Sequence, residues 1–110
     1  MQILPECLYY LAPSIKLEKI KKMGLVPKIA YDGTMIPARI YLLENFDSLI
    51  KLSKEIYKNT LIKDWLLLKI DVTQTPDNFI LYKDYKTDCG YYTMDNISPD
   101  IIEVVKEINF

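Results

Sequence analysis

The side chains in this sequence best suited to binding chemistry are tyrosines, of which there are nine in 110 residues. Five of them fall on three predicted strands: Tyr9, Tyr10, Tyr41, Tyr91 and Tyr92. Rings presented from neighbouring strands could line a cleft and stack on a planar group such as a nicotinamide or a nucleobase. Aromatic residues are also favoured in cores and on sheet surfaces, so the same five could be packing residues. The sequence alone leaves both interpretations open.

Two charged residues accompany this aromatic set. Arg39 opens a predicted strand after a long loop, where it could contact an anion or form a surface salt bridge. Asp95, which is followed by Asn96, could supply a catalytic carboxylate. It could also form a turn in which its side chain bonds to nearby backbone. Sequence spacing does not decide between these roles.

The composition excludes several familiar catalytic sites. The sequence has no histidine, so one chain cannot form Ser-His, Cys-His or histidine–metal sites. Its two cysteines, Cys7 and Cys89, cannot form a Cys₄ zinc site and are expected to be ordinary small hydrophobic residues in a reducing compartment. The three glycines are too scattered for a P-loop or a dinucleotide fingerprint. We therefore expect no metal site.

The overall composition is typical of one globular domain spanning residues 1–110, with 50% hydrophobic residues, 26% charged residues and a net charge of −1. This balance argues against a general phosphate-binding surface, although Lys16, Lys19, Lys21 and Lys22 could form a local patch instead of a solvated helix face. No apolar run approaches the ~20 residues that span a bilayer, and no signal peptide is visible. We expect a cytoplasmic protein without membrane association.

Two strand–helix units are predicted first along the chain. Residues 8–11 form a bulky apolar strand, and a helix follows with Ser14 as its expected N-cap and Gly24 as its left-handed C-terminal cap. Residues 28–38 are expected to form a loop. A second strand at 39–43 leads to a helix at 46–59 that is capped by Asn45 and has a full amphipathic pattern.

The second half of the chain is predicted to consist mainly of strands. They are expected at residues 64–72, 79–82, 91–94 and 101–108. The last of these could also be a frayed helix, although its β-branched residues favour a strand. Helices early in the chain and strands late in it indicate an α+β fold, with a split, mostly antiparallel sheet and two helices.

Three stretches in this order resemble the small ADP-ribosyltransferase-like fold, the group that includes RNA 2′-phosphotransferases and DNA-modifying ADP-ribosyltransferase toxins. The stretches are LYYLAPSIKLEKIKKMGLVP from residue 8, RIYLLENFDSLIKLSKEI from residue 39, and WLLLKIDV, LYKD and GYYTMDNISPDIIEVV from residue 65 onward. The resemblance extends over roughly residues 8–105. It implies that NAD binds in a cleft between the two halves of a split sheet.

The resemblance also implies a role for individual residues. Tyr10 stands where the family has a histidine that bonds the nicotinamide ribose, and Ala12 stands at the usual threonine. Arg39 and Tyr41 match residues that line the pocket. Asp95 matches the acidic residue that steadies the positive charge developing as nicotinamide leaves, although it is one methylene shorter than the family's glutamate. The predicted site therefore has Asp95 as catalytic residue and the other four around NAD.

Two functions follow from this resemblance. The first is an NAD-dependent enzyme that transfers ADP-ribose to a nucleic acid or a protein. The alternative is a catalytically inactive relative that binds a nucleotide or a protein as a phage or bacterial accessory factor. Two departures from the family pattern point to the inactive alternative: the missing histidine, and the aspartate in place of glutamate.

Overall fold

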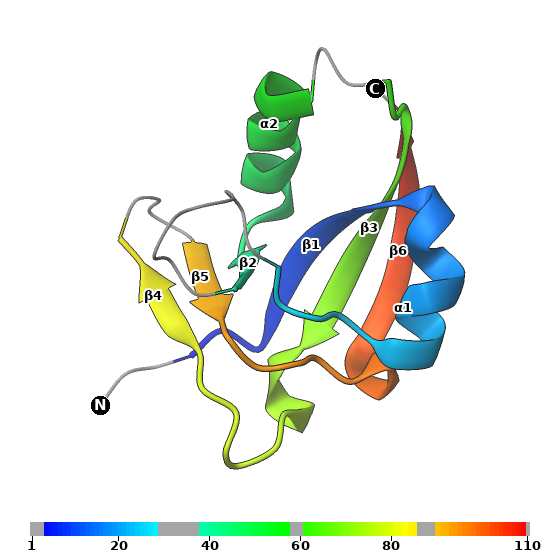
Figure 1. Cartoon of the computed structure of the whole chain (residues 1–110). Coiled ribbons are helices and arrows are strands. Elements are labelled where there is room, and N and C mark those ends of the chain that lie inside the picture. Colours follow the sequence, from blue (N-terminus) through cyan, green and yellow to red (C-terminus); the bar gives the residue numbers. More distant parts are fainter. Residues whose placement is uncertain (1–3, 29–37, 58–60, 86–89, 110) are drawn as a thin grey trace.

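The computed structural model describes residues 4–28, 38–57, 61–85 and 90–109 (Figure 1). The described chain contains an antiparallel sheet of six strands and two α-helices, which is an α+β arrangement as predicted. In chain order these are β1 (Cys7–Pro13), α1 (Leu17–Met23), β2 (Ile40–Leu43), α2 (Phe46–Tyr57), β3 (Asp64–Asp71), β4 (Tyr82–Asp84), β5 (Gly90–Thr93) and β6 (Ile102–Asn109). The predicted loop at 28–38, except for its ends, and Cys89 lie outside the described residues.

The strands are arranged in the order β4-β5-β2-β1-β3-β6, with β2 and β1 at the centre. The sheet is a single hydrogen-bonded sheet, and not the two separate halves that we predicted. The paired segment between β1 and β2 is nevertheless short. There the register joins only Tyr9 to Leu43, whereas β1 pairs with β3 along its whole length.

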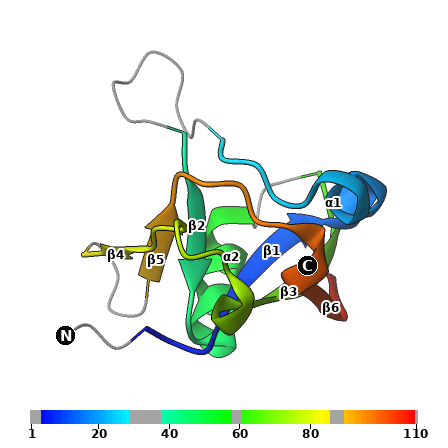
Figure 2. The same ribbon diagram turned by 90° about the horizontal axis from the view of Figure 1, so that it is seen from below.

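The two helices lie on opposite faces of this sheet (Figure 2). On the face covered by α1, here called the α1 face, Ile20 packs with the even-numbered residues of β1 and β3, such as Leu8 and Leu68. On the other face, the α2 face, Leu49 packs with Leu11, Leu43, Trp65 and Leu67. Because successive strand residues point to opposite faces, β3 supplies buried residues to both cores.

Local sequence signals account for the ends of both helices. The Asn45 side-chain oxygen accepts hydrogen bonds from the backbone N–H groups of Asp47 (2.8 Å) and Ser48 (3.2 Å), which confirms the predicted N-cap of α2. Gly24 ends α1 with φ at 74° and ψ at −158°. The positive φ was predicted, but this ψ is not that of the left-handed helical cap that we expected. The predicted N-cap at Ser14 is wrong. Ser14 lies inside a 3₁₀ turn (Ser14–Lys16) whose cap makes no side-chain hydrogen bond.

The strand predicted at 79–82 is displaced to Tyr82–Asp84. The preceding backbone is occupied by other bonds: Phe79 N–H donates to the Pro76 carbonyl at 3.0 Å, and Ile80 N–H donates to the Asp95 carboxylate at 2.9 Å. These groups are therefore not used in a strand ladder. The last segment is a strand, β6, preceded by a 3₁₀ turn (Pro99–Ile101). None of the described helices is long and apolar enough to cross a membrane.

Candidate functional site

Three tyrosines form a row across the β4-β5-β2 end of the sheet, which we call the tyrosine row. Tyr41 of β2 lies opposite Tyr92 of β5, and Tyr92 lies opposite Tyr82 of β4. The rings of Tyr82 and Tyr92 are stacked, with centroids 5.1 Å apart and an interplanar angle of 15°. The rings of Tyr41 and Tyr92 are tilted by 50° at 6.1 Å. Residues that lie opposite one another in antiparallel strands share a face, so the row is continuous.

Arg39 adds a positive charge to the tyrosine row. Its guanidinium carbon lies 4.1 Å from the centroid of the Tyr92 ring, in a cation–π contact. The Arg39 backbone is fixed by two hydrogen bonds with Lys28, in which each residue donates to the other's carbonyl at 2.9 and 3.0 Å. The Arg39 Nε atom is buried and has no hydrogen-bond partner among the described residues. The arginine is thus held against the row from both its backbone and its side chain.

A shallow hollow of about 510 Å³ adjoins the row at its β4 end. It is lined by Tyr82 and Tyr92 together with Leu81, Lys83 and Tyr85. Tyr85 is 92% exposed, and Tyr41 at the other end of the row is 42% exposed. Aromatic surface and the Arg39 guanidinium therefore lie together at one accessible end of the sheet. The Lys83 ammonium lies 4.7 Å from the centroid of the Tyr91 ring, on the α1 face.

The predicted site residues are divided between the two faces of the sheet. Tyr10 packs against the α1-face core, and Ala12 is buried within it. Arg39 and Tyr41 lie on the α2 face, because Tyr41 precedes Leu43 by two residues and Leu43 belongs to the α2-face core. The structure brings Arg39 and Tyr41 together at the tyrosine row. It does not bring Tyr10 and Ala12 to that row.

Asp95 is part of a hydrogen-bonded link between β5 and the segment before β4. Its carboxylate accepts from the Ile80 N–H at 2.9 Å, and its own N–H donates to the Thr93 hydroxyl oxygen at 3.1 Å. The Thr93 hydroxyl in turn donates to the Ile80 carbonyl at 2.8 Å. Thr93 is fully buried. The Asp95 carboxylate bonds backbone fifteen positions away, and not the nearby backbone that the predicted turn requires, so it already has a structural partner.

Replacing Asp95 with asparagine tests this structural role. The amide oxygen of asparagine can still accept from Ile80, so we expect a loss of at most ~1 kcal/mol in the free energy of unfolding. Asp95→Ala should cost more, about 0.5–1.5 kcal/mol, because the exposed hydrogen bond from the Ile80 N–H is lost. Urea titration of the two variants measures the difference. Equal stabilities for wild type and Asp95→Ala would contradict the role.

The remaining tyrosines of the predicted set are packing residues of the two cores. Tyr91 is buried on the α1 face, and this burial, followed by the nearby charge of Glu44, raises the pKa of its hydroxyl. Tyr9 contacts Phe46 on the α2 face at 6.4 Å between ring centroids. A hydrogen bond with the Cys7 thiol is the main cause of the raised pKa of Tyr9. Both hydroxyls are therefore neutral at physiological pH.

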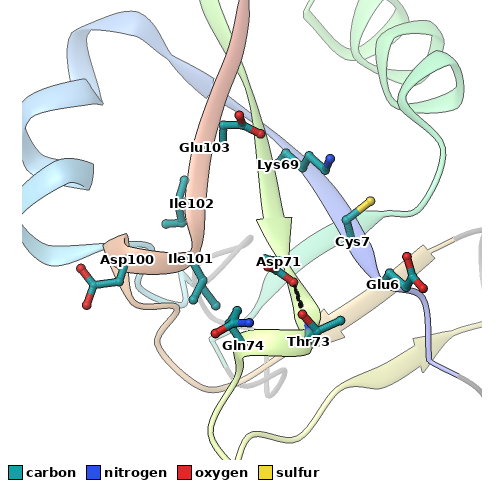
Figure 3. Close-up of a pocket in the computed structure, with 10 residues that line it drawn as sticks. All are labelled: Glu6, Cys7, Lys69, Asp71, Thr73, Gln74, Asp100, Ile101, Ile102 and Glu103. Atoms are coloured by element: carbon teal, nitrogen blue, oxygen red, sulfur yellow. Dashed lines mark hydrogen bonds between the residues drawn. The ribbon is translucent and has the colours of Figure 1, made fainter.

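A second hollow, of about 480 Å³, lies where β1 and β6 begin and β3 ends (Figure 3). Four carboxylates and one lysine line it: Glu6, Asp71, Asp100, Glu103 and Lys69. Figure 3 shows that Asp71 is engaged with Thr73, whose N–H donates to its carboxylate at 3.1 Å. Within the described residues there is no group of three or more acidic or cysteine side chains that could hold a metal ion. This hollow has no aromatic lining, which distinguishes it from the tyrosine row.

Sequence reasoning missed Tyr82 as a member of the site. Tyr82 was expected on a strand but not in the aromatic set, because its stacking on Tyr92 depends on the register between β4 and β5. Comparison with known proteins adds no further member: no family model matches the chain, and no curated protein matches it. The ADP-ribosyltransferase-like resemblance therefore stays a prediction, and the function is argued from the site itself.

Proposed function

We propose that this chain is a nucleotide-binding domain that takes a nucleobase or nicotinamide ring on the tyrosine row and does not transfer ADP-ribose. The observation that carries the proposal is the cross-strand row of Tyr41, Tyr92 and Tyr82 with the Arg39 guanidinium against its central ring. A rigid aromatic surface with an adjoining cation matches the two parts of a nucleotide, a planar ring and an anionic phosphate.

The energetic basis of the proposal is base–aromatic stacking. One base stacked on a protein ring contributes ~1–3 kcal/mol, with little dependence on which base it is. Tyr41 keeps much of its ring exposed, and Tyr82 and Tyr85 border an open hollow. Arg39 already stacks on Tyr92, so its orientation is fixed before a phosphate arrives and less freedom is lost on binding.

Binding is favoured over transfer by the positions of the other predicted residues. Ribosyl transfer requires the ring-binding and charge-stabilising groups to surround one ligand. Tyr10 and Ala12 belong to the α1 face, whereas Arg39 and Tyr41 belong to the α2 face. The Asp95 carboxylate bonds the Ile80 backbone. The proposal thus develops the non-enzymatic alternative, with NAD as one ligand among several to test.

The experiment is a titration of the isotope-labelled protein with AMP, NAD, ADP-ribose and a ten-residue oligothymidine, followed by NMR. We expect the largest shifts at Tyr41, Tyr82 and Tyr92. Tyr82→Ala should weaken binding roughly tenfold, because one stacking contact is lost. Tyr82→Phe keeps the ring and should bind as wild type does.

Matched controls and contrary outcomes are available. Arg39→Gln should weaken the binding of phosphate-bearing ligands more than the binding of adenosine. Lys19→Gln, on the exposed surface of α1, should change the binding of neither. Shifts confined to the α1 face around Tyr10 would refute the proposed location. Release of nicotinamide from NAD would refute the absence of transfer and restore the enzymatic hypothesis.

A further inference from the structure

A groove of about 350 Å³ runs between α2 and β6, away from the tyrosine row. Its apolar lining consists of Phe46 and Ile50 from the helix and Ile108 from the strand. Ile108 and Lys106 point to the α2 face, since they pair with Trp65 and Leu67 of the α2-face core. The helix therefore covers the middle of its face and leaves a channel toward β6.

The charges around this groove are mainly positive. Lys51 and Lys54 line it from α2 and Lys106 from β6, while Asp47 is the acidic residue in its lining. All three lysines are exposed. The Lys106 ammonium lies 4.7 Å from the centroid of the Phe46 ring, so it is held over the groove. A chain with a net charge of −1 thus concentrates positive charge beside an apolar channel.

The outer edge of β6 adds backbone groups to this surface. β6 is the terminal strand of the sheet, and within the described residues no strand pairs with its outer side. Val105 forms a bulge: Val104 pairs with Leu68 and Lys106 with Leu67, so Val105 has no partner in β3. A bulge limits unspecific pairing along a whole edge. The segment from Lys106 to Asn109, beyond the bulge, is regular and lies next to the groove.

We propose that an extended acidic peptide segment of a partner protein docks here, pairing with the outer edge of β6 from Lys106 to Asn109. In such strand addition, backbone hydrogen bonds supply affinity and alternate side chains supply specificity. Apolar side chains of the peptide fill the groove over Phe46, Ile50 and Ile108. Its carboxylates meet Lys51, Lys54 and Lys106.

A peptide fits these features better than a nucleic acid does. A strand edge offers backbone donors and acceptors in the spacing of another polypeptide strand. The groove has one aromatic ring in its lining, Phe46, and therefore no row of rings on which successive bases could stack. The lysines supply long-range attraction for an acidic sequence, and the narrow apolar lining selects side chains.

The test uses a fluorescein-labelled peptide of ten residues in which leucine and glutamate take turns at every second position, with threonine between them, so that both side chains face the groove. Its binding to the whole chain is measured by fluorescence anisotropy. We expect saturable binding that weakens as salt rises, because surface charges are screened. The double variant Lys51→Glu/Lys54→Glu should weaken binding at least tenfold. The matched double variant Lys19→Glu/Lys22→Glu, with the same charge change on α1, should bind as wild type does.

Changing the backbone of the peptide tests the proposal with wild-type protein, so the result does not depend on whether a protein variant folds. The same peptide N-methylated at alternate residues keeps its charge but loses half of its donors, and we expect it to bind at least tenfold more weakly. NMR shifts of wild-type protein should centre on residues 106–109. Equal binding of the methylated peptide, equal binding of a lysine–leucine peptide, or no binding would overturn the proposal.

Two other occupants are distinguished by the same materials. Binding of the ten-residue oligothymidine that is lost in Lys51→Glu/Lys54→Glu would assign the groove to nucleic acid and overturn the peptide proposal. A concentration-dependent dimer in sedimentation that the same variant abolishes would assign it to a second copy of the chain. Because the groove and the tyrosine row have separate residues, failure of one proposal leaves the other intact.

Discussion

Replacing Gly24 with alanine is expected to lower the free energy of unfolding by about 3 kcal/mol or more. Gly24 has φ at 74°, a conformation that L side chains rarely adopt. A Cβ atom at this position would also overlap the carbonyl oxygen of Ile97 and press on the Pro99 ring. That carbonyl is fixed by the Leu25 N–H, which donates to it at 2.9 Å. Neither neighbour can move aside cheaply.

The effect should extend beyond the end of α1. Leu25 and Ile97 form a bridge in which each N–H donates to the other's carbonyl at 2.9 Å, and both side chains are buried in the α1-face core. Chemical denaturation measures the loss. Met23→Ala is the matched control, because Met23 precedes Gly24 and is 54% exposed; its cost should stay below ~1 kcal/mol. A Gly24→Ala variant as stable as that control would contradict the proposed collision.

The features that the sequence predicted well are those decided by neighbouring residues. Asn45 can cap α2 because it stands directly before the helix, and Gly24 is recognised because few other residues adopt its conformation. Most strands were recognised from short runs of bulky residues. These signals act within a few positions of the chain, so one sequence is sufficient to read them.

The features that escaped prediction depend on which strands become neighbours. Tyr82 joins the tyrosine row only through the register of β4 with β5. The segment before β4 is not a strand because a distant carboxylate, Asp95, bonds the Ile80 N–H. The separation of Tyr10 from Tyr41 follows from the single register pair of Tyr9 with Leu43. A shift of one residue in the pairing of β1 with β2 would exchange the faces to which their side chains point. No residue near Tyr9 or Leu43 in the sequence specifies this register.

Leu68→Ala should cost about 3 kcal/mol in the free energy of unfolding, within the usual range of 2–5 kcal/mol for a buried leucine. Leu68 is 0% exposed and belongs to the α1-face core. It pairs with Tyr10 on one side and Val104 on the other, so all three share the α1 face. Val104, 43% exposed in the same cross-strand row, is the matched control, and Val104→Ala should cost less than ~1 kcal/mol. Urea titration of both variants measures the contrast, and equal losses would contradict the assignment of Leu68, rather than Val104, to the α1-face core.

The same cross-strand row decides the role of Tyr10. Tyr10 lies beside Leu68 and packs against the α1-face core, so Tyr10→Ala should destabilise the protein by an amount between those of Leu68→Ala and Val104→Ala. If Tyr10→Ala instead leaves stability unchanged and weakens NAD binding, the ring is a ligand contact and the α1 face holds the nucleotide. The resemblance to the ADP-ribosyltransferase-like fold would then gain its first direct support. A loss of stability with unchanged nucleotide binding would leave the tyrosine row, on the opposite face, as the place where a nucleotide is held.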